Sequence, residues 1–232
     1  MTTETGTPRS TTRGRAGRPR SAAGTRAALL AAGTELFAEH GFDGVSVSAI
    51  ALKAGANKAM ISYHFGGKRD LYVAILAATF QEIVADVERI AESTGPAPRV
   101  LREMIAAIGD TATRRHPHFC TMMLREVLTG GARLEKAVLA QPMRVLGAVQ
   151  RIVERGVREG AFRPVDPLLT HLSLVGSLVF FFATTRFRQR MIRDRLHREA
   201  PDGATYVKHL QDLIIEGLAT RGARSSQADR PS

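Results

Sequence analysis

The spacing of apolar residues is helical along almost the whole chain, and this constrains the fold more than any other feature. From Thr25 onward, apolar residues recur at intervals of three and four positions, and glycines and prolines divide the pattern into segments. No segment shows sustained two-residue alternation, and no period of about 20 to 50 residues repeats. The sequence therefore predicts an all-α protein, and 232 residues are enough to bury a core.

Capping residues and breakers set the expected helix boundaries. Ser46 and Asn57 are suited to cap the starts of two short helices, and Gly55 separates these two helices. The stretch Leu168 to Ala183 lacks charged residues but contains polar ones and runs into arginines, so we expect a buried helix rather than a membrane span. The predicted helices cover residues 25–40, 47–54, 58–65, 68–94, 99–115, 119–128, 133–140, 143–159, 167–195 and 203–221.

The first three predicted helices form a helix-turn-helix arrangement, in which the second short helix enters a DNA major groove. In this helix Ile61 and Phe65 point inward, whereas Lys58, Ser62 and Tyr63 are left outward. The pattern alone also occurs in helical bundles that do not bind DNA. Basic residues clustered at this helix and the following turn favour DNA, because DNA phosphates would lie there: Lys58, His64, Lys68 and Arg69.

The overall charge also favours a polyanionic partner. The formal net charge is +11 and the calculated isoelectric point is about 10.9. Residues 1–22 form a predicted disordered basic arm, and residues 223–232 form a predicted disordered tail. Within the arm, Gly-Arg-Pro-Arg with Arg18 and Arg20 resembles the core of minor-groove AT-hook segments. The alternative is a generic basic arm that adds non-specific affinity.

The run from Thr25 to Tyr72 resembles the DNA-binding domain of TetR/AcrR-family repressors. The matching motifs are LFAEHGFDGVS, IALKAGA and YHFGGKRDLY. The resemblance implies a TetR-like fold, with a helix-turn-helix domain over residues 23–70 and a helical effector-binding and dimerisation domain over residues 71–222. It also implies a homodimer that binds a pseudo-palindromic operator and commonly represses until a small-molecule effector releases it.

The resemblance implies roles for individual residues of the DNA-binding domain. Tyr63 and His64 match an aromatic–histidine pair that contacts phosphates and thymine methyl groups, and Lys68 matches a phosphate-contacting lysine. At Ser62 the chain departs from the family, because many members carry an aromatic residue there, and the carried-over base preference is then in doubt. The alternative is that Tyr63 and His64 only cover the domain surface. The predicted DNA-contacting set is Ser46, Lys58, Ala59, Ser62, Tyr63, His64 and Lys68, with Arg18 and Arg20 from the arm.

Two apolar helix faces in the C-terminal half are suited to dimerisation or to the core of one subunit. The first is Leu168 to Phe182, and the second carries Val207, Leu210, Ile214 and Leu218. An apolar effector would need a pocket of adaptable side chains with a polar group. The candidates, which are equally suited to ordinary core packing, are Met104, Phe119, Met122, Met123, His171, Phe181 and Phe182.

Other functional classes have little support in the sequence. No phosphate-binding glycine loop, nucleophile elbow or paired acid motif is present, so we expect no enzyme and no cofactor. His116, His118 and Cys120 could ligate zinc or copper, but capping and core packing explain them as well, and we predict no metal. The single cysteine and the lack of a signal peptide predict a cytoplasmic, nucleoid-associated protein. A basic, weakly specific DNA-binding architectural protein is the alternative function.

Overall fold

A computed structural model describes residues 21–196 and 199–220, and these residues form an elongated all-helical molecule. The basic arm with Arg18 and Arg20, and the tail 223–232, lie outside the described residues. Within the described residues the only β-type pairing is an isolated bridge between Phe162 and Ala219. The predicted all-α class is confirmed.

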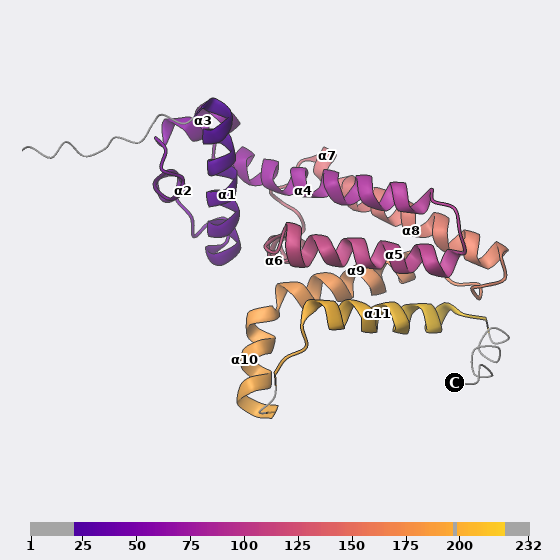
Figure 1. Ribbon diagram of the computed structural model, residues 1–232. Helices are drawn as coiled ribbons and strands as arrows, with labels where there is room; N and C mark the ends of the chain where they lie inside the picture. The colour runs from indigo at the N-terminus through magenta and orange to yellow at the C-terminus, as the bar shows by residue number, and fades with distance from the viewer. Residues whose placement is uncertain (1–20, 197–198, 221–232) are drawn as a thin grey trace, which may run out of the picture.

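Three helices form the N-terminal unit at one end of the molecule: α1 (Ala22–His40), α2 (Val47–Ala54) and α3 (Ala59–Phe65). Figure 1 shows them as a group from which α4 (Lys68–Ala91) runs into the rest of the protein. Apolar burial is the main stabilising contribution in so small a unit. The side chains that hold the three helices together have no exposed surface, and they are Leu29, Phe37, Ile50 and Ile61.

Local capping explains where α2 and α3 begin and end. The Ser46 hydroxyl accepts a hydrogen bond from the Ala49 amide at 3.1 Å, and the Asn57 side-chain oxygen accepts one from Ala59 at 2.9 Å. Gly55 takes a left-handed conformation with φ of 62°, which ends α2 in the way that favours glycine. These are the caps and the breaker that the sequence predicted.

The remaining helices form a bundle around α4. Helix α4 packs against α5 and α8, α8 packs against α9, and α11 lies along α5. A short π-helix, η1, continues α5 before the chain turns into α6. The elements are α5 (Ala97–Asp110), η1 (Thr111–Arg115), α6 (Phe119–Leu128), α7 (Lys136–Leu139), α8 (Gln141–Arg158), α9 (Pro167–Ala183), α10 (Thr185–Leu196) and α11 (Gly203–Leu218).

Three predicted boundaries in this bundle are wrong. The segment 167–195 is two helices, because the chain bends by 68° between α9 and α10. The predicted helix 133–140 is only the four-residue α7. Pro142 does not separate α7 from α8 but lies in the first turn of α8, where a missing amide hydrogen costs nothing.

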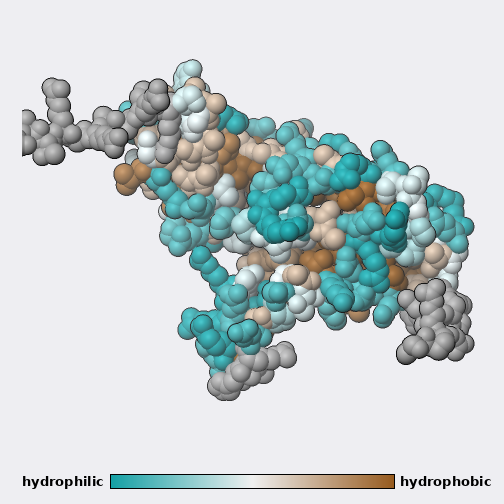
Figure 2. Space-filling view, in the orientation of Figure 1, coloured by the Kyte–Doolittle hydropathy of each residue, from teal (hydrophilic) through white to brown (hydrophobic). Residues whose placement is uncertain are grey.

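Helix α10 projects from the bundle on the side of the N-terminal unit (Figure 1). Figure 2 shows it as a hydrophilic lobe, with a hollow between this lobe and the N-terminal unit. Within the described residues no single helix is long and apolar enough to cross a membrane, although α9 and residues Thr185–Asp194, bent against each other, pass the length and composition test together.

Candidate DNA-binding face and inter-domain cleft

Helix α3 presents an exposed outer face. Ile61 is fully buried and anchors the helix, whereas Lys58, Ala59 and Ser62 are exposed and 75% of the Tyr63 surface is accessible. A seven-residue helix with one buried side and a free polar side can enter a groove without disturbing its own core. The outward set predicted from the helical spacing is therefore the set that the fold leaves free.

His64 and Lys68 are placed differently from the other residues predicted to contact DNA. The His64 Nε2 atom is buried without a hydrogen-bond partner among the described residues, and the ring lies edge-on to Tyr63 at 4.9 Å between centroids. The Lys68 ammonium donates to the Val45 carbonyl oxygen at 2.8 Å and lies 4.2 Å from the centre of the Phe42 ring. Lys68 thus connects the start of α4 to the loop before α2, a contact that helical spacing alone did not predict.

Polar side chains of α6 connect the bundle to the N-terminal unit. The Arg125 guanidinium donates to the carbonyl oxygens of Ala38 and Glu39 at 3.5 and 3.4 Å, at the end of α1. Arg125 can approach because Gly41, with φ of 73°, has no side chain, and a Cβ there would lie 2.6 Å from Nη1. Arg133, beyond α6, pairs with Asp43 in the loop between α1 and α2 at 2.7 Å.

A buried carboxylate lies behind this connection. Glu126 has only 1% of its surface exposed, and it accepts a hydrogen bond from the Tyr72 hydroxyl of α4 at 2.9 Å. The Arg133 guanidinium lies 3.5 Å from the same carboxylate oxygen. Burial and this hydrogen bond raise the pKa of Tyr72, so the phenol stays protonated and donates. No local sequence pattern marks Arg125, Glu126 or Arg133, because their partners lie far away along the chain.

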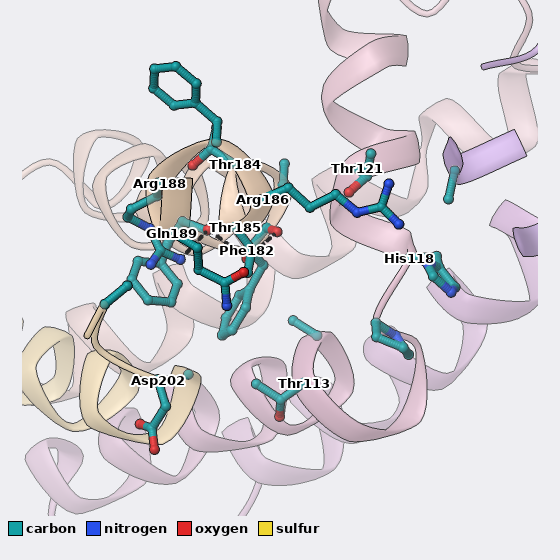
Figure 3. A pocket seen from close by; sticks show the side chains of 18 of the residues that line it. Thr113, His118, Thr121, Phe182, Thr184, Thr185, Arg186, Arg188, Gln189 and Asp202 are labelled. Atoms are coloured by element: carbon teal, nitrogen blue, oxygen red, sulfur yellow. Dashed lines mark hydrogen bonds between the residues drawn. The ribbon is translucent and has the colours of Figure 1, made fainter. Parts of the chain in front are cut away.

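A cleft of about 850 Å³ lies between the N-terminal unit and the lobe of α10 (Figures 2 and 3). One wall is α1, with Glu35, Ala38 and Glu39; the other walls come from η1, α6, the α9–α10 bend and the segment 200–203. In Figure 3, Arg186 extends across the cleft toward Thr121 and His118. A volume of this size is in the range of small-molecule sites.

Only two of the residues proposed to line an effector pocket lie on this cleft. Phe181 and Phe182 border it. The other five, Met104, Phe119, Met122, Met123 and His171, are buried and border neither the cleft nor the smaller pocket between α9 and α11. The structure therefore divides the predicted set, because helical spacing identifies buried faces but does not distinguish a packed core from a cavity wall.

The His-x-His-x-Cys motif is also divided. His116 Nε2 lies 2.9 Å from the Glu82 carboxylate, whereas His118 borders the cleft. Cys120 is buried, and burial raises the pKa of its thiol to about 12, which disfavours the thiolate that binds metals. Among the described residues no group of three histidine, cysteine or acidic side chains is placed to hold a metal ion.

Apolar side chains are exposed together on α9 and α11. Leu169, Leu172 and Phe180 of α9 and Leu213 of α11 each expose more than half of their surface. Of the residues predicted for dimerisation on α11, Leu210 and Leu218 are buried within the subunit, and Val207 and Ile214 are half-buried. The exposed face of α11 is thus centred on Leu213, next to the residues predicted from the sequence.

Comparisons with known proteins identify both halves of the chain. Residues 29–75 match the family model "Bacterial regulatory proteins, tetR family", and residues 98–214 match "Tetracyclin repressor-like, C-terminal domain". The transcriptional repressor NicS of Pseudomonas putida is 29% identical over 199 residues, which are 84% of this chain and 92% of that protein. The transcriptional regulator RutR of Escherichia coli K12 is 24% identical over 213 residues, which are 88% and 95% of the two chains.

Solved structures share the fold. The regulator PfmR of Thermus thermophilus superposes with a TM-score of 0.67 at 24% identity, and the match covers 83% of this chain and 99% of that chain. The ketosteroid regulator KstR2 of Mycobacterium tuberculosis gives a TM-score of 0.69 at 20% identity, with coverage of 89% and 99%. The match to both structures extends over the N-terminal unit and the bundle together.

Proposed function

The chain belongs to the TetR family of bacterial transcriptional regulators, and we propose that it is a homodimeric repressor that leaves its operator when a small molecule binds. The relatives NicS and RutR are helix-turn-helix transcriptional regulators and not enzymes. The observation that carries the proposal is the free outer face of α3, held in place by buried Ile61. Binding to chromosomal DNA would place the protein on the nucleoid.

The proposed DNA contacts follow from exposure. Lys58, Ala59 and Ser62 are exposed at the start and middle of α3 and are the candidates for base edges, and Tyr63 is the candidate for a phosphate or thymine methyl group. Exposed Ser46, at the start of α2, is a candidate for the phosphate backbone. His64 and Lys68 support these contacts by holding Tyr63 and the loop before α2, and the remaining donors of the Lys68 ammonium are available to a phosphate.

The proposed dimer forms through the exposed apolar face of α9 and α11. Leu169, Leu172, Phe180 and Leu213 would otherwise leave a large apolar surface in water. A two-fold axis at this face would pair the α9 and α11 helices of the two subunits and present two copies of α3. Such a dimer reads two half-sites about one helical turn of DNA apart, which gives a pseudo-palindromic operator.

The contacts between α6 and the N-terminal unit support release by an effector. Glu35, Ala38 and Glu39 of α1 border the cleft, so a ligand there would contact the DNA-binding unit directly. Arg125 borders it too, and donates to the carbonyl groups of Ala38 and Glu39. A shift of α1 moves α2 and α3 with it, because the three helices share one core. Separating or rotating the two copies of α3 then weakens operator binding without unfolding the protein.

Selection of bound sequences from random DNA duplexes by the purified protein tests the proposal, at a low and a high salt concentration. We expect a palindromic motif that is lost in Tyr63→Ala and altered at individual base positions in Lys58→Ala. Lys208→Ala is the matched control, because it removes the same charge from an exposed position on α11. Salt-sensitive binding to every duplex without an enriched motif would contradict the proposal and favour a weakly specific architectural protein.

A further inference from the structure

The charged groups that border the cleft are not balanced among themselves. Three guanidinium groups border it, from Arg125, Arg186 and Arg188. The Arg186 side chain forms no hydrogen bond or ion pair with any residue in the described ranges 21–196 and 199–220. The hydrogen bonds of Arg125 and Arg188 go to backbone carbonyl oxygens, so neither has a carboxylate partner among those residues.

The carboxylates that border the cleft are engaged elsewhere. Glu35 pairs with Lys53 of α2 at 2.7 Å, and this contact lowers the pKa of the carboxyl group. Asp202 accepts a hydrogen bond from the Thr205 amide at 2.7 Å as the cap of α11, which lowers its pKa. Glu39 lies 3.8 Å from the imidazole of its neighbour His40. The cleft therefore offers positive charge to an entering molecule.

Arg188 is the most constrained of the three arginines. Its guanidinium carbon lies 3.5 Å from the centre of the Phe181 ring, and that ring stacks on Tyr206 at 3.7 Å with an angle of 4° between planes. Nη2 donates to the Phe181 carbonyl oxygen at 3.0 Å, whereas Nε and Nη1 are buried and have no hydrogen-bond partner among the described residues. Burial without an acceptor lowers the pKa of Arg188. Unpaired buried donors are costly, and an incoming acceptor relieves that cost.

We propose that the cleft binds a small organic carboxylate, held by Arg188, with its apolar part against Phe182. A guanidinium nitrogen without a partner can donate to a carboxylate oxygen, and stacking on Phe181 fixes the plane of the Arg188 guanidinium. Phe182 is half-buried on the cleft wall and gives the rest of the ligand an apolar surface. Carboxylate binding itself does not depend on the proposed function; only the expected weakening of operator binding by the carboxylate rests on it.

The position of the cleft gives the carboxylate a direct effect on α1. Arg125 and Glu39 border the same cleft, so a negative charge in it attracts the Arg125 guanidinium away from the carbonyl oxygens of Ala38 and Glu39 and repels the Glu39 side chain. Both effects weaken the attachment of α6 to the end of α1. Because linkage is reciprocal, operator DNA must weaken carboxylate binding by the same factor by which the carboxylate weakens DNA binding.

Thermal unfolding of the full-length protein with paired probes tests the ligand class. The probes are sodium benzoate, phenylacetate and octanoate, each compared with its neutral amide at the same concentration. We expect at least one carboxylate to raise the Tm while its amide does not, because only the charged form pairs with the guanidinium groups. If every amide matches its acid, or if none of the three acids raises the Tm, the inference is wrong.

Variants on α10 assign the effect to the cleft. Arg188→Gln should weaken carboxylate binding by at least about ten-fold, the loss that follows removal of a charged hydrogen-bonding partner. Arg186→Gln removes a positive charge that borders the cleft at an exposed position, so it should weaken binding several-fold, and it keeps the test informative if Arg188→Gln does not fold. Arg190→Gln is the matched control, because its side chain is 82% exposed on the same helix and does not border the cleft. Equal binding by all three variants would overturn the inference.

Operator binding without ligand separates this inference from the proposed function. If the protein selects an operator but no carboxylate stabilises it, the repressor proposal stands and the ligand inference fails. If carboxylates stabilise the protein through Arg188 but no operator is selected, the ligand inference stands and the repressor proposal fails.

Discussion

Replacing Tyr72 by phenylalanine removes the hydroxyl that donates to the buried Glu126 carboxylate at 2.9 Å and keeps the ring. The ring contacts with Phe37 and Phe42 remain, at 5.0 and 5.3 Å between centroids. The carboxylate is then left with the Arg133 guanidinium at 3.5 Å as its nearest charged partner. The loss is therefore confined to one hydrogen bond to a buried charged group.

The expected cost follows from that geometry. A hydrogen bond to a charged group contributes about 1.5–3 kcal/mol to the free energy of unfolding. For a chain of this length each kcal/mol lowers the Tm by about 2–4 °C, so Tyr72→Phe should lower it by about 3–12 °C. Thermal unfolding followed by circular dichroism measures the change, at one fixed protein concentration because the proposed dimerisation would also contribute to stability.

Tyr63→Phe is the matched control, because Tyr63 is 75% exposed and loses the same hydroxyl. It should change the stability by less than about 0.5 kcal/mol. A double-mutant cycle with Glu126→Gln then isolates the pair, and the two substitutions should not be additive. If Tyr72→Phe is no more destabilising than Tyr63→Phe, the Tyr72 hydroxyl is not what stabilises the buried carboxylate, and the reasoning is refuted.

Two further predictions concern the bundle. Gly156→Ala should lower the free energy of unfolding by about 1–3 kcal/mol, because its Cβ would overlap the buried ring of Phe162. Gly147→Ala on the same helix should be neutral or stabilising, because the nearest atom to its Cβ is 3.7 Å away. Equal effects of the two substitutions in chemical denaturation would contradict the close packing at Gly156. Burial lowers the pKa of His171 from its usual 6.5. As the pH drops below about 6.5, this histidine therefore gains a proton in the unfolded chain before it does in the folded protein, and stability should fall. The Tm of His171→Gln should depend less on pH over that range, and identical pH profiles would count against the effect of burial.

The sequence predicted the outer face of α3 because a single helix is governed by local spacing. Burying Ile61 on one side leaves Lys58, Ser62 and Tyr63 on the other, whatever the rest of the chain does. The caps at Ser46 and Asn57 were predictable for the same reason, since each acts within three residues. These features needed no knowledge of the tertiary arrangement.

The features that the sequence did not predict depend on distant partners. Arg125 and the carbonyl of Ala38 are 87 residues apart, and Tyr72 and Glu126 are 54 apart, so no local pattern connects them. The bend at Thr184 was missed because neither glycine nor proline marks it. There the Thr184 hydroxyl donates to the Phe180 carbonyl oxygen at 2.7 Å, and the Arg188 guanidinium donates to the Phe181 carbonyl oxygen, so side chains satisfy the end of α9.

The hydrogen bonds of Arg125 to the end of α1, and the ion pair of Arg133 with Asp43, are contacts that water can replace. When α6 moves away from the N-terminal unit at these contacts, water hydrates the separated polar groups, and no large apolar surface is exposed there. A regulator with such polar contacts can change the orientation of its DNA-binding unit repeatedly without aggregating with other proteins. The polarity of these contacts between α6 and the N-terminal unit therefore favours reversible switching.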